Sequence, residues 1–464
     1  MATTLTDRAA TVDLDVKRQE IVVQAEAAAL RLVRFLYCDN DGIIRGKSSG
    51  MASLKDRLES GIGLTLAMQA FTMLDHLATV AGMGPVGEIR LVPDPTTFTI
   101  APYAPHTGTV LVDMQTLDGK PYAADGRGFL KRMVDRAAER DLAVLAAFEP
   151  EWSLARKELD QFVPIDDSGC FTPTGMNIAA TVIDEVVASL QAQGMNVEQY
   201  YAELGWGQQE LSISPAPAVL AADHHLLYRE TIRGTALKYA LYASFAPKPW
   251  ADQAGNGCHL HFSVWDAAYR NNHFYEQGAE YNLSPLARQF MAGILDHLPA
   301  LLALTCASVN SYRRLQPQMW ASAYRAWGPD NREGALRVAS PFKGHEAEST
   351  NIELKSSDSS ANPYISMGGV IAAGLDGIER RLELAPPALV DPHILDDNQR
   401  KAIGADRLPA SLKEAVQNLK RDDVLLKAMG ERLATSYIAV KELDIEAFAA
   451  EDDAFEFRQH IYKY

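Results

Sequence analysis

Residues 255–266, GNGCHLHFSVWD, place a cysteine and two histidines within four positions: Cys258, His259 and His261. On a β-strand, both histidines would point to one face of the sheet and the cysteine to the other. A structural zinc site usually takes three or four Cys and His ligands, often including a cysteine pair, and this segment has no such pair. A single strand histidine is more often packed or hydrogen bonded than bound to a metal. The segment alone therefore leaves its chemistry open.

Glutamates occur in three further segments that have the character of strands or strand ends. Glu149 and Glu151 in FEPEWSL would share one face of a strand. Two carboxylates placed in this way repel each other unless a cation lies between them. The proline between them also allows a turn at a solvated strand end. Glu203 and Glu210 flank the Gly-rich turn of AELGWGQQELSI, and Glu353 lies in NIELKSSD. Taken singly, each acid is more often an ordinary surface residue or a salt-bridge partner than a ligand.

The hydrophobic pattern around these segments predicts a mixture of helices and strands. In the first part of the chain we expect a helix that runs into a strand over 19–39, a turn at 40–42, and strands within 87–100 and 108–114. Further on we expect a strand over 142–154 and helices over 129–141, 176–194, 285–304, 362–383 and 423–441. The helix over 176–194 would align Ile178, Val182, Val186 and Leu190 on one stripe and end at Gly194.

A polar N-terminal segment and a change in the pattern of expected elements after residue 118 divide the chain into three parts. We expect a flexible tail over 1–16, a small α+β domain over 17–118 and a large α+β domain over 119–464. A length of 464 residues is too great for one ordinary core, which supports at least two domains.

Composition excludes several classes of protein. The formal charge of −16 means that nucleic-acid binding would need a local basic patch, and the short basic pairs of this chain do not provide one. The four cysteines form no C-x-x-C pair, which argues against a disulfide framework. The N-terminal segment lacks the apolar core of a signal peptide, and no stretch approaches the roughly 20 apolar residues of a membrane span. We therefore expect a cytoplasmic protein with neither nucleic-acid nor membrane partners.

Together and in this order, the segments resemble the motifs of the glutamine synthetase family. FEPEWSL is similar to the first metal strand of that family, and AELGWGQQE to the second. ASFAPKPW followed by GNGCHLHFSVWD resembles its proline-lysine-proline segment and its metal/ATP strand. NSYRRLQP and WGPDNREGALRV resemble its substrate-arginine segments, and NIELKSSDSSANPYISMGGVIAAGLDGIE resembles its final metal strand with the helix that follows.

The resemblance implies an enzyme that couples ATP to amide formation. In this family ATP phosphorylates the side-chain carboxylate of glutamate, and an amine then displaces the phosphate. Clustered phosphate and carboxylate charges require divalent ions, and Mg²⁺ (or Mn²⁺), with two or more ions per site, suits oxygen-rich ligands. By resemblance one ion would be held by Glu151, Glu203 and Glu210, and the other by Glu149, His259 and Glu353.

The resemblance also assigns residues to the substrates. ATP contacts fall on His261, Ser263 and Arg337, and glutamate contacts on Gly255, Arg314 and Arg332. The catalytic cations would be Arg332, Arg337 and Lys355, of which the arginines neutralise charge during phosphoryl transfer.

The amine site departs from the family pattern. Ammonium-using members supply an aspartate from the N-terminal domain and a glutamate from a mobile flap. Here those places are taken by Thr65, between Leu64 and Leu66, and by Trp320. An amine pocket made of these residues favours a hydrocarbon or aromatic substituent, because burial is worth about 0.8 kcal/mol per methylene. Elsewhere Lys355 replaces an arginine and Ala254 an asparagine that helps to hold glutamate, so a glutamate analogue is an open alternative as carboxyl donor.

We therefore expect ligation of the glutamate γ-carboxylate to a primary monoamine, either an alkylamine or an aniline-like amine. The alternatives are an ammonium-using glutamine synthetase and a γ-glutamyl polyamine or ethanolamine ligase. A catalytically dead structural relative is disfavoured, because all six metal positions are filled.

The resemblance further implies a β-grasp-like N-terminal domain beside a catalytic domain built on a curved antiparallel sheet. It implies a homo-oligomer of hexameric rings, usually stacked as a dodecamer. Each active site would lie between subunits, and the segment 61–68 of one subunit would reach the cleft of its neighbour.

Overall fold

The computed structural model describes residues 13–159 and 161–464. Residues 1–12 of the predicted tail lie outside this range. The predicted end of the tail at residue 16 is wrong, because helix α1 begins at Leu14. Asp13 caps this helix by accepting a hydrogen bond from the backbone N–H of Asp15 at 3.0 Å.

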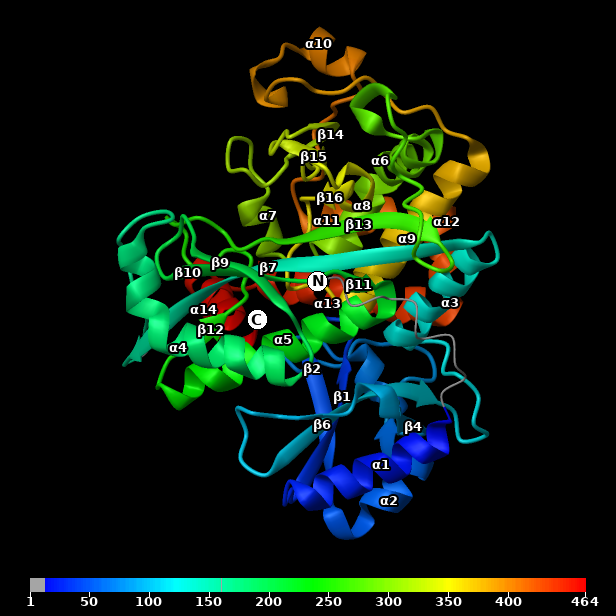
Figure 1. Cartoon of the computed structure of the whole chain (residues 1–464), viewed down its shortest axis with the longest axis vertical. Coiled ribbons are helices and arrows are strands. Elements are labelled where there is room, and N and C mark those ends of the chain that lie inside the picture. Colours follow the sequence, from blue (N-terminus) through cyan, green and yellow to red (C-terminus); the bar gives the residue numbers. More distant parts are fainter. Residues whose placement is uncertain (1–12, 160) are drawn as a thin grey trace.

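The N-terminal domain is a twisted sheet with two helices against it, drawn in blue in Figure 1. Among the described residues, six strands pair in the order β2-β1-β6-β4-β3, with β5 added on β6. The β1–β6 pair is parallel and the remaining pairs are antiparallel. The elements are α1 (Leu14–Ala27), β1 (Leu32–Cys38), β2 (Ile44–Gly50), α2 (Met51–Ser60), β3 (Ile62–Thr65), the 3₁₀-helix η2 (Leu66–Ala70), β4 (Glu88–Pro93), β5 (Thr99–Ile100) and β6 (Thr107–Gln115).

The catalytic domain is organised around one long strand, β7, which crosses the middle of the molecule beside β13 (Figure 1). Its ten-stranded sheet, counted over the described residues, has the order β14-β15-β16-β13-β7-β10-β9, and β8, β11 and β12 also pair with β7. Its strands are β7 (Leu142–Glu158), β8 (Gln161–Pro164), β9 (Val197–Ala202), β10 (Gln208–Ile213), β11 (Ala216–Pro217), β12 (Tyr242–Ser244), β13 (Cys258–Asp266), β14 (Tyr324–Pro329), β15 (Gly334–Val338) and β16 (Ile352–Leu354). The sheet is antiparallel as predicted except for the parallel β14–β15 pair.

Helices cover one face of this sheet and form the main core. Helices α3 and α5 pack against β7, and α9 packs against both of them and against α6. The helices are α3 (Gly126–Ala138), α4 (Pro173–Ala192), α5 (Ala218–Lys238), α6 (Pro285–Thr305), α7 (Ser311–Arg314), α8 (Glu346–Ser349), α9 (Pro363–Arg380), α10 (Asp397–Ala402), α11 (Leu412–Leu419), α12 (Asp423–Met429), α13 (Glu431–Ala449) and α14 (Asp453–Lys463). The opposite face of β7 is not covered by these helices and is open to a binding site.

Two details of the predicted helices are wrong. The helix expected over 423–441 is divided into α12 and α13 at Gly430, whose φ of +82° is a conformation that a helix does not contain. In α4, Val182, Val186 and Leu190 are buried as expected, whereas Ile178 is exposed. Gly175 and Ala179, in the same two turns of the helix, are buried, so the core-facing stripe passes beside Ile178.

Polar contacts deep in the molecule fix the N-terminal domain on the catalytic domain. Lys441 of α13 pairs with Asp41 in the β1–β2 turn, and both side chains are buried. The hydroxyl of Tyr464 donates a hydrogen bond to the backbone carbonyl of Asp41 at 2.6 Å. Among the described residues, no helix combines the length and apolar character that crossing a membrane requires.

Candidate active site

The register of the large sheet brings the predicted acids and histidines together on its open face. Along β7, residues at even positions from Leu142 to Phe148 are buried and those at odd positions less so, which leaves Glu149 and Glu151 on the open face. Across the neighbouring strands, His259 pairs with Glu149, Glu210 with Glu151, and His261 with Glu353. Residues directly opposite each other in an antiparallel pair share a face.

Glu203 reaches the same place from the turn between β9 and β10. The turn closes when the backbone N–H of Glu203 bonds the carbonyl of Gln208 at 2.9 Å. Gly207 adopts a φ of +64°, and a Cβ there would lie 2.4 Å from the carbonyl oxygen of Leu154. This close approach requires glycine and explains the Gly-rich turn noted in the sequence.

A cavity of about 1340 Å³, part of it open to solvent, lies over these residues. Thirteen of the residues predicted for the site line it: Glu149, Glu151, Glu203, Glu210, Gly255, His259, His261, Arg314, Trp320, Arg332, Arg337, Glu353 and Lys355. Ala254, the departure noted in the glutamate site, also lines it.

One group in the cavity has the spacing of a metal site. Ligand atoms of Glu149, His261 and Glu353 lie within 4.8 Å of one another. His259 Nδ1 is also 3.0 Å from Glu353 Oε1 and 3.6 Å from Glu149 Oε2. His261, assigned from the sequence to the nucleotide, therefore stands beside His259 as a possible ligand. Carboxylate oxygens with an imidazole nitrogen fit a divalent ion such as Mg²⁺ or Mn²⁺.

The pKa values of the buried glutamates also indicate a site for cations. Burial, together with the charges of Glu149 and Glu151, raises the pKa of Glu210 to about 11. Burial and the charge of Glu151 likewise raise the pKa of Glu203. Without a cation these carboxylates destabilise one another, and a divalent ion between them would favour their charged forms.

Cations gather at the other side of the cavity. Arg337 Nη1 is 2.5 Å from Glu353 Oε2, and Lys355 Nζ is 3.3 Å from Glu353 Oε1. Although burial raises the pKa of Glu353, the charges of Lys355 and His259 hold it well below its ordinary value. Arg314 Nη2 lies 3.2 Å from His259 Nε2. The cavity therefore has an acidic wall that meets a basic wall at Glu353, an arrangement suited to holding polyphosphate and carboxylate groups.

The predicted amine pocket is only partly present in one chain. Trp320 lines the cavity, whereas Leu64, Thr65 and Leu66 do not. Leu64 was assigned wrongly, because its side chain is buried in the core of the N-terminal domain. Thr65 caps η2, because its hydroxyl oxygen accepts a hydrogen bond from the backbone N–H of Ala67 at 3.4 Å.

Ser263 also lies outside the cavity. It is on the same face of β13 as His261, but it is buried and its Oγ accepts a hydrogen bond from Trp265 Nε1 at 2.8 Å. An ATP contact by Ser263 stays a prediction.

Several residues of the cavity were not predicted from the sequence. Gln208 Nε2 donates to Glu151 Oε2 at 2.8 Å, and the hydroxyl of Tyr201 donates to Glu210. Both are polar residues two positions from a glutamate that is predicted to be a ligand on the β9–β10 hairpin, and this spacing is a signal in the sequence. Apolar residues of the wall were also missed: Phe171, Leu204 and Met319. Single apolar residues in loops carry no signal in one sequence.

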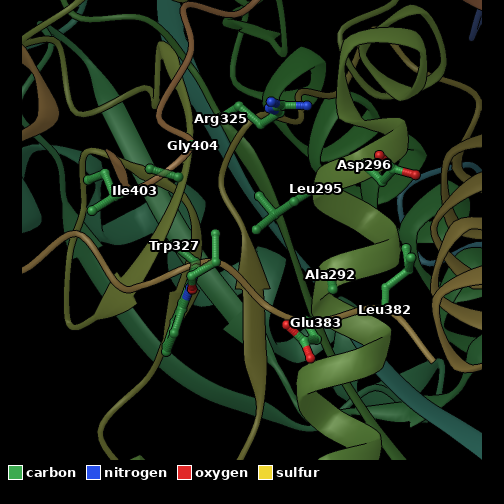
Figure 2. A pocket seen from close by; sticks show the side chains of 11 residues that line it. Ala292, Leu295, Asp296, Arg325, Trp327, Leu382, Glu383, Ile403 and Gly404 are labelled. Carbon is green, nitrogen blue, oxygen red and sulfur yellow. The ribbon is translucent and has the colours of Figure 1, made fainter. Parts of the chain in front are cut away.

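A second cavity, of about 560 Å³, lies away from this site between α6 and β14 (Figure 2). Leu295 and Trp327 face it together with Asp296, Arg325 and Glu383. Among the described residues that line it, none belongs to the predicted site. The candidate active site is therefore the cavity over β7 and β13.

Comparisons with known proteins identify the family. The model described as "Glutamine synthetase, catalytic domain" matches residues 123–460, and "Glutamine synthetase N-terminal domain" matches residues 17–122. The chain belongs to the glutamine synthetase family. The predicted fold class, a small N-terminal domain beside a large catalytic domain of mixed helices and sheet, is confirmed. The two models meet close to the boundary expected after residue 118.

Individual relatives cover nearly the whole chain. Gamma-glutamylpolyamine synthetase GlnA3 of Streptomyces coelicolor is 37% identical over 411 residues, which is 87% of either chain. A glutamine synthetase of Methanococcus maripaludis is 30% identical over 93% of this chain and 96% of its own. The solved structure titled "GmaS/ADP complex-Conformation 1" is 27% identical, with a TM-score of 0.82 over 94% of this chain and 98% of that one. A "novel glutamine synthase homolog" gives a TM-score of 0.84 at 32% identity, over 94% of this chain and 99% of that one. Members of this family are ATP-dependent ligases that use divalent metal ions, and this chain is a glutamine-synthetase-like ligase.

Proposed function

We propose that the protein joins the γ-carboxylate of L-glutamate to a primary monoamine that carries an apolar substituent. A γ-carboxylate oxygen bonds to the γ-phosphorus of ATP while the bond to the β–γ bridging oxygen breaks, and ADP leaves. The amine nitrogen, as its free base, then bonds to the carbonyl carbon of the γ-glutamyl phosphate. The carbon–oxygen bond to phosphate breaks, the nitrogen loses a proton, and a γ-glutamylamide is released.

The residues of the cavity have distinct tasks in this reaction. Glu149, Glu151, Glu203, Glu210 and Glu353, with His259 or His261, are the groups that would hold the divalent ions. When bound, these ions neutralise the ATP phosphates and draw electron density from the reacting phosphorus. Arg314 would hold the α-carboxylate of glutamate, and Arg332, Arg337 and Lys355 would stabilise the negative charge of the transferring phosphoryl group.

The observation that carries the choice of amine is the apolar mouth of the cavity. Trp320 stands where ammonium-using members have the flap glutamate, and Phe171, Leu204 and Met319 line the same cavity. Trp320, Leu204 and Phe171 are 67%, 61% and 58% exposed, which is unusual for side chains of this size unless something covers them. A hydrocarbon substituent on the amine would bury this surface, whereas ammonium would not.

A γ-glutamylpolyamine ligase is the second candidate. It is favoured by the 37% identity to a gamma-glutamylpolyamine synthetase over most of both chains. A polyamine carries a second positive charge that would need an acid near the mouth. The nearest acids, Glu203 beside Leu204 and Glu333 beside Trp320, are bonded to the backbone of those residues, and the flap itself contributes only Met319 and Trp320 to the lining.

An amine panel decides between these activities. Phosphate release from ATP with glutamate and Mg²⁺ would be measured with ammonium, ethanolamine, methylamine, isopropylamine, aniline and putrescine, and the amide product would be confirmed by mass. We expect kcat/KM for isopropylamine or aniline to exceed that for ammonium by about 10–200-fold, the range that small apolar groups provide in a pocket.

A matched pair of variants tests the role of the mouth. Trp320→Glu should shift the preference toward ammonium. Trp206→Glu, at an exposed tryptophan that does not line the cavity, should leave it unchanged. If putrescine is the best substrate, the second candidate is correct. If ammonium is best, the apolar mouth does not select the amine.

A further inference from the structure

The segment that carries Trp320 has an unfavourable backbone conformation. Gln318, Trp320 and Ser322 have φ angles of +60°, +55° and +64°, although none of them is glycine. Left-handed conformations of this kind are sterically unfavourable for residues with a Cβ and persist only where the surroundings hold them. Something outside the segment must therefore fix it.

The turn between β14 and β15 supplies that support. Glu333 Oε1 accepts a hydrogen bond from the backbone N–H of Trp320 at 2.8 Å. Ser322 Oγ donates to the carbonyl of Gly334 at 2.8 Å. The same turn contains Arg332, which lines the cavity. The apolar mouth and a predicted phosphate-contacting arginine are thus attached to one short piece of chain.

Glu333 is an unusual residue for such a turn. It is only 8% exposed, and its Oε2 is buried without a hydrogen-bond partner. Among the described residues it forms no ion pair, and the charge of Lys355 acts on it only from beyond ion-pair distance. Burying a carboxylate in this way is costly. The bond that this carboxylate makes is directed to the Trp320 segment and not to its own turn, which indicates a role in holding that segment.

We propose that Glu333 is a positioning residue that holds the Trp320 segment, and with it the apolar mouth, against the turn that carries Arg332. Its effect on the amine rests on the proposed function, because that function assigns the mouth to the amine. Loss of the Glu333 bond frees the Trp320 segment, so the amine binds more weakly while glutamate phosphorylation continues.

Three variants test this role: Glu333→Ala, Glu333→Gln and, as a control, Glu348→Ala at an exposed glutamate of α8. Glutamine keeps the side-chain length and an oxygen that can accept the Trp320 N–H, whereas alanine removes the acceptor. The first readout is amide hydrogen exchange of residues 316–323 in the substrate-free protein. We expect Glu333→Ala to speed exchange there by about tenfold, the effect of losing one hydrogen bond, and the other two variants to stay near the parent.

The second readout separates amine binding from phosphorylation. In Glu333→Ala the KM for the preferred amine should rise by about tenfold, while the KM values for glutamate and ATP change by less than about twofold. In Glu333→Gln the amine KM should return toward that of the parent.

Unchanged exchange in Glu333→Ala overturns the positioning role, and so does faster exchange with an unchanged amine KM. A glutamine variant as impaired as the alanine variant also overturns it, because the charge of Glu333 would then act on the amine directly. If the parent ligates no amine at all, the proposed function fails, and the exchange measurement still decides whether Glu333 holds the segment.

Discussion

Two glycines beside Arg314, the proposed glutamate clamp, differ in what a methyl group would meet. At Gly257 a Cβ would lie 2.5 Å from Arg314 Nη2, the movable end of a side chain. At Gly255 it would lie 2.4 Å from the carbonyl oxygen of Pro247, which is fixed backbone. We expect Gly257→Ala to displace the Arg314 guanidinium and raise the KM for glutamate by about tenfold, or about 1.4 kcal/mol. Gly255→Ala should instead lower the free energy of unfolding by about 1–3 kcal/mol.

Steady-state kinetics and urea unfolding of both variants check this pair. A destabilised Gly257→Ala with normal glutamate affinity would contradict the placement of Arg314 as the glutamate clamp.

Because the buried glutamates of the cavity repel one another, we expect the free energy of unfolding to increase when a divalent ion binds between them. A ligand that binds only the folded state stabilises it by about 2.7 kcal/mol at a hundred times its Kd, so MgCl₂ should raise the melting temperature and EDTA should reverse the rise. Glu210→Gln removes one ligand charge without changing shape. We expect this variant to be at least as stable as the parent without Mg²⁺ and to gain less than half as much with it.

Differential scanning calorimetry with and without Mg²⁺ measures both quantities, with Glu348→Gln as the surface control. An undiminished gain in Glu210→Gln would exclude Glu210 as a ligand.

The sequence motifs located the residues of the acidic wall, but they did not settle every assignment among them. His259 and His261 share a strand face because they are two residues apart, so spacing cannot choose between them, whereas distances to Glu149 and Glu353 place both near one ion site. Leu64 was wrongly placed in the amine pocket because in a strand as short as β3 the core decides which side chains are buried.

At the scale of elements, the hydrophobic pattern predicted whether a segment is a helix or a strand better than it predicted where that element begins and ends. The strand over 142–154 and the helices near 285 and 363 were found where the periodicity is strong. The break at Gly430 could not be seen, because the apolar spacing continues through it and only the φ of +82° ends the helix.

Three helices meet at one buried histidine, and this contact predicts a pH dependence of stability. His297 of α6 lies 2.7 Å from Asp422, the N-cap of α12, and 3.0 Å from Asp376 of α9. Arg380 also contacts Asp376 and pairs with Asp296 of α6. Burial lowers the pKa of His297, but the hydrogen bonds to Asp422 and Asp376 outweigh it and raise the pKa above its ordinary value.

A raised folded-state pKa adds stability that is fully present below the unfolded value, about 6.5, and is lost as pH rises through the folded value. The loss of unfolding free energy in His297→Gln should therefore be largest near pH 6 and shrink toward pH 9. Urea unfolding at several pH values measures it, with the exposed His345→Gln as control. A loss that does not vary with pH would mean that His297 is neutral in the folded protein.

At the scale of the whole molecule, the N-terminal domain is held in place yet contributes nothing to the cavity of its own chain among the described residues. Asp41, Lys441 and Tyr464 fix the domain at the junction, while Thr65 and Leu66 lie outside the cavity lining. Members of the family are oligomeric. The predicted entry of segment 61–68 into a neighbour's cleft is therefore a property of the oligomer, in which it is tested.

Mixed oligomers provide that test. Arg337→Ala disables the catalytic cavity, and Thr65→Arg blocks the segment predicted to enter the neighbour's cavity, so each variant alone should be nearly inactive. If every site joins the cavity of one subunit to the N-terminal domain of the next, random co-assembly gives a site an intact cavity in half of the cases and, independently, an intact N-terminal segment in half. Co-expressed, doubly tagged oligomers should then recover about a quarter of the parent activity per site. Mixtures no more active than the two variants alone would contradict a site shared between subunits, and an active Thr65→Arg variant would show that Thr65 has no part in the site.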